Sequence, residues 1–153
     1  MARIYARRKG KSRSKRPPTK TPPEWVPLKP EEVEELVCTL YNEGHPPSII
    51  GLILRDQYGV PSVKALCKKS ITQILKERGF EIKYPEDLLN LMKKAVNLRK
   101  HLEKHRKDIH NRRALQLIEN KIRRLAEYYV EKGVLPKGWT YRPEEAALIV
   151  KGA

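Results

Sequence analysis

A polar segment at residues 99–113 combines the residue types that phosphate binding and base recognition require. Its lysines and arginines suit phosphate oxygens, whereas histidine and asparagine both donate and accept hydrogen bonds and suit base edges. One aspartate, Asp108, lies among these cations. Because a carboxylate repels phosphate, charge attraction alone does not explain its presence. The candidate phosphate-binding residues are Lys100, Lys104, Arg106, Lys107, Arg112 and Arg113.

Asp108 has two interpretations, which are compatible with one another. An ionised carboxylate only accepts hydrogen bonds, so it can accept the guanine amino group in the shallow minor groove of A-form RNA. Alternatively, Asp108 caps a following helix at a solvated helix corner. His101 and Asn111 are further candidates for base and 2′-hydroxyl contacts, and His105 is a further candidate for RNA binding.

Metal binding and catalysis have little support in the sequence. His101 and His105 are four residues apart and share a helix face, but the residues near them are mostly lysines and arginines, which disfavour a zinc ion. The chain contains no Walker A loop, no G-x-S-x-G and no H-E-x-x-H sequence. We therefore expect no metal, no cofactor and no enzymatic activity.

The charge of the chain indicates a polyanionic partner. The 153 residues contain 33 Lys and Arg against 18 Asp and Glu, a net charge of +15 that is typical of nucleic-acid-binding proteins. A single phenylalanine disfavours a basic membrane-surface helix. No apolar stretch reaches the ~18 residues that span a membrane. The two cysteines fit reduced thiols, so we expect a cytoplasmic protein without a membrane partner.

Residues 1–23 form a basic arm, with nine Lys or Arg and no acid. The arm has too little apolar surface to offset its ordering entropy, so by itself it should be disordered. The absence of acids favours an arm that binds along RNA over a solubilising tail. The candidate contacts are Arg3, Arg7 and Arg8 to phosphates, and Tyr5 stacking on a base.

The remainder of the chain predicts an all-α protein. Short amphipathic segments separated by Gly and Pro predict a small helical domain over residues 24–82, with Ser48, Ser62 and Ser70 as N-caps. The apolar residues among 25–28 are expected to anchor the preceding segment onto this domain.

Residues 83–133 predict a long antiparallel helical hairpin, because apolar residues recur at steps of three and four on both sides of the polar segment. The expected seam is Leu88, Leu91, Ala95, Leu98 and Leu102 against Leu115, Ile118, Ile122, Leu125 and Tyr129. This arrangement places residues 99–113 at the corner of the hairpin. Residues 134–153 are predicted to form a C-terminal loop and a short helix.

A DNA-binding regulator is the alternative function, because residues 48–66 fit the outline of a helix-turn-helix. Such a regulator would prefer duplex DNA and would dimerise to match two half-sites. The second helical segment offers only Ser62 and Lys64 as base contacts, which is too few for sequence readout. A weaker alternative is a structural adaptor whose N-terminal domain docks another protein, and this role is compatible with RNA binding.

Several ordered motifs resemble one protein family. Residues 99–108, RKHLEKHRKD, are similar to the signature of the universal small-subunit ribosomal protein fifteen family. Residues 47–56, PSIIGLILRD, resemble the additional domain of its archaeal and eukaryotic branch, whose eukaryotic member is called protein thirteen. The C-terminal Trp139 and Tyr141 also fit. The resemblance covers nearly the whole chain and is weakest over residues 1–23.

The resemblance implies a structural constituent that binds the central domain of small-subunit ribosomal RNA and supports subunit assembly and translation. Neighbouring ribosomal proteins are the implied partners, and no homo-oligomer is expected. In the family, a His and an Asp at the hairpin corner read an RNA minor groove, and these map to His101 and Asp108. Bacterial members have a serine in place of Asn111. Since the family's hairpin edge also faces RNA, further candidates are Arg123, Arg124 and Tyr128.

Overall fold

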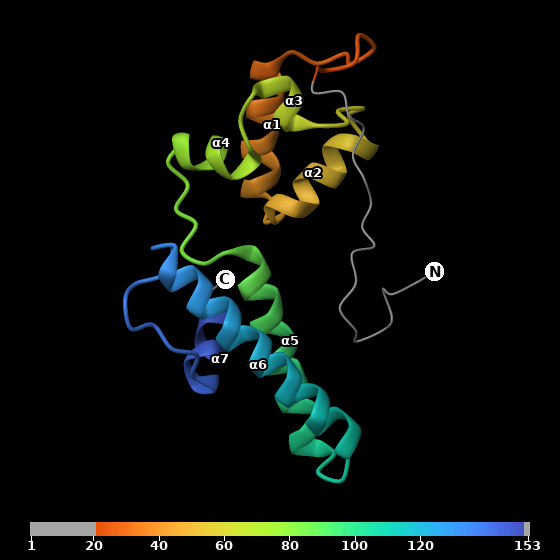
Figure 1. Cartoon of the computed structure of the whole chain (residues 1–153). Coiled ribbons are helices and arrows are strands. Elements are labelled where there is room, and N and C mark those ends of the chain that lie inside the picture. The colour runs from red at the N-terminus through yellow and green to blue at the C-terminus, as the bar shows by residue number, and fades with distance from the viewer. Residues whose placement is uncertain (1–20, 152–153) are drawn as a thin grey trace. The chain divides into compact units, whose positions relative to one another are not determined.

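The structure, a computed structural model, describes residues 21–151, and the regular structure within that range is entirely helical (Figure 1). The prediction of an all-α protein is confirmed. The chain divides into two compact units, one ending at Phe80 and the other beginning at Glu81. Within the described range, no helix is both long enough and apolar enough to cross a membrane.

The N-terminal unit consists of four short helices around a small apolar core. The helices are α1 (Pro30–Asn42), α2 (Pro47–Asp56), α3 (Val63–Cys67) and α4 (Ile71–Glu77). Each of the longer helices buries one apolar stripe, as its sequence periodicity predicts. The most deeply buried side chains are Val33, Val37, Ile50, Leu54, Val60, Ile74 and Leu75.

Two of the three predicted serine caps are present. The Ser62 side chain accepts a hydrogen bond from a main-chain N–H of α3, and Ser70 forms a reciprocal capping box with Gln73 at the start of α4. The prediction for Ser48 is wrong, because α2 begins one residue earlier, at Pro47. A proline suits the first helical position, since its φ angle is already helical and its missing N–H would have had no partner there.

The segment before α1 is only partly anchored. Val26 and Leu28 are half-buried, as the sequence predicts, but the Trp25 side chain remains 65% exposed and lies near the turn at Gly59. Gly59 has a φ of +68°, a conformation that favours glycine.

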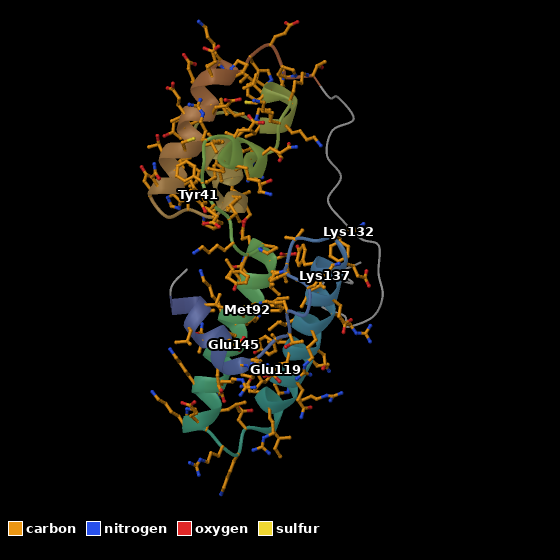
Figure 2. The ribbon with its side chains drawn as sticks, turned by 90° about the vertical axis from the view of Figure 1, so that its left-hand side faces the viewer. Tyr41, Met92, Glu119, Lys132, Lys137 and Glu145 are labelled. Carbon is orange, nitrogen blue, oxygen red and sulfur yellow. The ribbon has the colours of Figure 1, made fainter. Side chains whose placement is uncertain are left out.

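The C-terminal unit is built on the predicted hairpin. Helix α5 (Glu86–Lys104) and helix α6 (Ile109–Glu131) pack antiparallel, and α7 (Pro143–Lys151) packs against α5 (Figure 1). Met92 of α5 lies in the core of this unit and is fully buried (Figure 2). The other buried core residues are Leu88, Ala95, Ile122, Leu135, Tyr141 and Ala146.

Polar interactions join α5 and α6 near both ends of the hairpin. At the open end, the Tyr129 hydroxyl donates to the Asp87 carboxylate, at 2.8 Å from Oδ1 and 2.7 Å from Oδ2. Nearer the corner, the Arg99 guanidinium pairs with Glu119, whose side chain is only 12% exposed (Figure 2). The register of the hairpin is therefore held by polar contacts as well as by its apolar seam.

The Tyr129–Asp87 contact makes the stability of this unit depend on pH. Partial burial and the hydrogen-bonded carboxylate raise the pKa of Tyr129 to about 12, compared with about 10 in an unfolded chain. Because the folded-state pKa is raised, the stabilising effect is complete below pH 10 and is lost as the pH rises through 12.

We expect Tyr129→Phe to lower the free energy of unfolding by about 1 kcal/mol at pH 8. The difference from the natural chain should shrink between pH 10 and 12, since the ionised phenol no longer donates. Urea unfolding at pH 8, 10 and 11 measures this difference. Tyr128→Phe is the matched control, because Tyr128 is 49% exposed and lies next in the chain. An equal pH dependence in both variants would contradict the assignment.

Candidate nucleic-acid interface at the hairpin corner

The corner of the hairpin is a four-residue connection, residues 105–108, between α5 and α6. The main-chain N–H of His105 donates to the His101 carbonyl at 2.9 Å, and that of Asp108 donates to the His105 carbonyl at 3.1 Å. The Arg112 guanidinium reaches back from α6 and donates to the Arg106 carbonyl at 2.6 Å. The connection is therefore held from both helices.

Asp108 is the N-cap of α6 and also the centre of a side-chain cluster. Its Oδ1 accepts from the main-chain N–H of Asn111 at 2.9 Å, which confirms the predicted cap. Its Oδ2 accepts from the Asn111 side-chain amide at 2.7 Å and lies 3.1 Å from His101 Nε2. The structure thus brings together the three residues that the sequence singled out as base contacts.

These hydrogen bonds fix the ionisation state of Asp108. The main-chain N–H of Asn111, the His101 ring and the Asn111 amide hold the pKa of the Asp108 carboxyl well below its usual range. A carboxylate has about four acceptor positions, of which three are occupied here. Asp108 therefore keeps about one free acceptor position, and among the described residues the side-chain Oδ1 of Asn111 receives no donor.

Exposed cations surround this cluster, as predicted. A shallow depression at the corner includes three of them, Lys104, Arg106 and Lys107, together with His101 and Asp108. Arg112 and Arg113 use one guanidinium nitrogen each for an internal hydrogen bond, to Arg106 and to Gln116 respectively, and keep the remaining donors. The exposed cations are Lys100, Lys104, Arg106, Lys107, Arg112 and Arg113.

His101 of α5 and His105 of the corner connection lie against each other. The ring centroids of His101 and His105 are 4.6 Å apart, with 34° between the ring planes. His105 is the more exposed of the two and offers an aromatic face at the rim of the depression. Within residues 21–151, no group of three or more His, Cys, Asp or Glu side chains is placed to hold a metal ion.

The predicted contacts on the hairpin edge form a separate region. Arg123, Arg124 and Tyr128 are exposed on α6, and the Lys132 ammonium lies 5.9 Å from the centre of the Tyr128 ring. At 1.5 Å per helical residue, Tyr128 lies about 25 Å along α6 from Asn111. A partner would have to be extended to contact both regions. The arm residues Arg3, Arg7 and Arg8 lie outside the described residues.

Two features of the corner were not identified from the sequence. Ile109 begins α6 and is 75% exposed, so a large apolar side chain lies next to the polar cluster. The sequence did contain a signal for this exposure. Ile109 is not three or four residues from the seam residue Leu115, so it falls outside the spacing pattern of the seam. Glu103 also lines the depression, where it limits how closely a phosphate can approach.

The arrangement combines a hydrogen-bonded cluster with exposed cations around it. The cluster presents acceptors in a defined geometry, whereas lysine and arginine side chains adapt to a phosphate backbone.

Helix α3 has five residues, which is too short to place successive side chains along a DNA groove, and this argues against the helix-turn-helix alternative. Trp139 and Tyr141 pack internally, the former near Tyr84 and the latter in the core.

Comparisons with known proteins find related sequences over nearly the whole chain. Residues 1–60 match the family described as Ribosomal S13/S15 N-terminal domain, and residues 70–149 match the family Ribosomal protein S15. Over 146 residues the chain is 53% identical to small ribosomal subunit protein uS15 of Hyperthermus butylicus, which covers 95% of this chain and 91% of that protein.

Two further relatives are similar over most of their length. The uS15 of Methanocella arvoryzae is 52% identical over 150 residues, covering 98% of this chain and 99% of the relative. The uS15 of Methanobrevibacter smithii is 57% identical over 129 residues, covering 84% of this chain and 98% of the relative. The resemblance found in the sequence is confirmed: the chain belongs to the S15 family of small-subunit ribosomal proteins, in its archaeal type with the S13/S15 N-terminal domain, and is a structural protein rather than an enzyme.

Proposed function

We propose that the chain binds and organises the central domain of small-subunit ribosomal RNA, with the hairpin corner as its selective contact. The observation that carries the proposal is the His101–Asp108–Asn111 cluster, held in one geometry among exposed cations. The relatives are named as small-ribosomal-subunit proteins, which supports RNA and neighbouring ribosomal proteins as partners. The proposal places the chain in the cytoplasm, within assembled subunits.

The cations and the cluster have different parts in the proposed binding. Lysine and arginine side chains displace counterions from phosphates, which gives affinity that depends on salt but not on sequence. The cluster contacts base edges in the wide minor groove of an RNA helix. A guanine amino group donates either to the free acceptor position of Asp108 or to the side-chain Oδ1 of Asn111.

Selectivity follows from the cost of an unmatched acceptor. An A·U pair has no amino group in the minor groove, so the free acceptor positions at the corner would be desolvated without gaining a donor. The internal hydrogen bonds of the cluster and the Arg112 contact to the Arg106 carbonyl hold these oxygens in position before binding. Little side-chain entropy is then lost when RNA docks.

Two further contacts extend the proposed interface. The hairpin edge at Arg123, Arg124 and Tyr128 binds a second part of the same RNA, since it lies on the same helix as the cluster. The basic arm binds along the phosphate backbone, as its nine cations and lack of acids suggest.

Competition binding tests the proposal as a whole. Central-domain ribosomal RNA is compared with a scrambled RNA and with duplex DNA of equal length, at moderate salt. We expect roughly a hundredfold preference for the ribosomal fragment, or some 2.7 kcal/mol. Equal and salt-sensitive binding to all three would reject selective recognition, and a preference for the duplex would favour the helix-turn-helix alternative.

We expect Asp108→Asn to lower the discrimination between the cognate RNA and an RNA with an A·U pair at the contact, by roughly tenfold. Asparagine caps a helix as well as aspartate does, so the fold is kept while one acceptor becomes a donor. Asp108→Ala should lose both the discrimination and the cap. Filter binding to both RNAs, with urea unfolding, measures the two effects.

Lys104→Gln is the matched control for this prediction. Lys104 is an exposed cation of the same depression, and its loss should weaken binding to all RNAs equally. It should also reduce the slope of log affinity against log salt by about one. If Asp108→Asn lowered specific and non-specific affinity by the same factor, the assigned role of the carboxylate would be wrong.

Deleting residues 1–23 should flatten the salt dependence of binding, because up to nine phosphate-binding cations are removed. The measurement is the slope of log affinity against log salt for the full chain and for the shortened chain. The preference for the ribosomal fragment should remain, since the corner is intact. A slope that does not change would reject an arm that contacts RNA.

A further inference from the structure

The positive charge of the chain is concentrated outside the N-terminal unit. Residues 1–23 carry nine cations and no acid, and residues 81–153 carry seventeen cations against ten acids. Residues 24–80, in contrast, carry seven cations against eight acids, a net charge of −1. Electrostatic attraction to RNA therefore accounts for the arm and the hairpin, but not for this unit.

The N-terminal unit contains a groove of about 640 Å³ between α2 and the first residues of α3 and α4. Its lining is mainly apolar and includes Gly51, Leu52, Val63 and Ile71. Leu52 is 44% exposed, and Ile49, one helical turn before it on the same face of α2, is 39% exposed. This face of α2 is thus only partly covered by the described residues of this unit.

Gly51 lines the groove without a side chain. A Cβ atom at this position would lie 3.4 Å from the end of the Ile71 side chain, which is an ordinary van der Waals distance. A glycine inside a helix is destabilising, and its φ here is not in the left-handed region. Neither the backbone conformation nor the contact with Ile71 therefore requires a glycine at this position.

The charged residues of the groove are few and of one sign. Arg55 and Lys64 line it, and no acid does. Arg55 is paired with Asp56 at 2.7 Å, whereas no ion pair is formed by Lys64 within the described part of the chain. One unpaired cation is too few to bind an RNA backbone, but it suits a single acidic group at the edge of an apolar ligand.

We propose that this groove binds a segment of another protein that combines apolar side chains with an acidic residue. The apolar side chains lie over Gly51 and Leu52, and the acidic residue pairs with Lys64. Thr21 and Pro23, at the end of the basic arm, belong to the lining of the groove. The arm fits less well as the occupant, because it has no acid and would meet two cations. The proposal is independent of the RNA site at the hairpin corner.

Selection from a random dodecapeptide phage library on the purified full-length chain tests the proposal. We expect the enriched peptides to contain at least two large apolar residues and an acid. A synthetic enriched peptide should shift the amide NMR signals of Gly51 and Leu52 in the isotope-labelled chain. Leu52→Glu should weaken binding of this peptide at least tenfold. Lys64→Glu should weaken binding less, and the loss should grow with the number of acidic residues in the peptide.

Leu148→Glu is the matched control, because Leu148 is a 70% exposed leucine of the C-terminal unit. This variant should bind the peptide normally, and all three variants should keep their preference for ribosomal RNA, so that a failure here is distinct from a failure of the RNA site. No enrichment, enrichment of basic peptides, or unchanged binding by Leu52→Glu would overturn the proposal. Shifts of the same amides by a scrambled single-stranded RNA would assign the groove to RNA instead.

Discussion

The Asp108 carboxylate is the interaction on which the hairpin corner depends. It ends the connection between α5 and α6 by capping the second helix, and the same group orients His101 and Asn111. A carboxylate surrounded by cations keeps its charge, because it accepts three hydrogen bonds within the corner. The structural and the proposed recognition roles of Asp108 therefore rest on the same carboxylate, and both require an acceptor at this position.

The rest of the C-terminal unit serves to hold this corner in place. The seam around Met92 sets the separation of the helices, and polar contacts fix their register near each end, at Asp87–Tyr129 and at Arg99–Glu119. The surrounding cations have no such restraint, apart from the few that donate to the chain itself. Rigid acceptors and mobile cations together suit a partner with a variable backbone and a defined base edge.

The two units present surfaces of different chemistry. The hairpin is cationic and polar, whereas residues 24–80 are nearly neutral and leave apolar side chains such as Leu52 exposed beside a groove. Such a division fits a component that contacts RNA through one part and protein through another. It also explains why the net charge of the whole chain is a poor guide to any single surface.

The sequence determined the helices, the hairpin and the identity of the corner residues, because periodic apolar residues and local caps act over a few positions. Local patterns also account for the errors. At Ser48 a preceding proline began the helix first, and the Trp25 side chain stays mostly exposed beside the turn at Gly59. Only the tertiary structure decided the Asp87–Tyr129 contact, which joins residues 42 positions apart, and the groove over Gly51. Such features depend on how separate helices pack, and one segment of sequence does not carry that information.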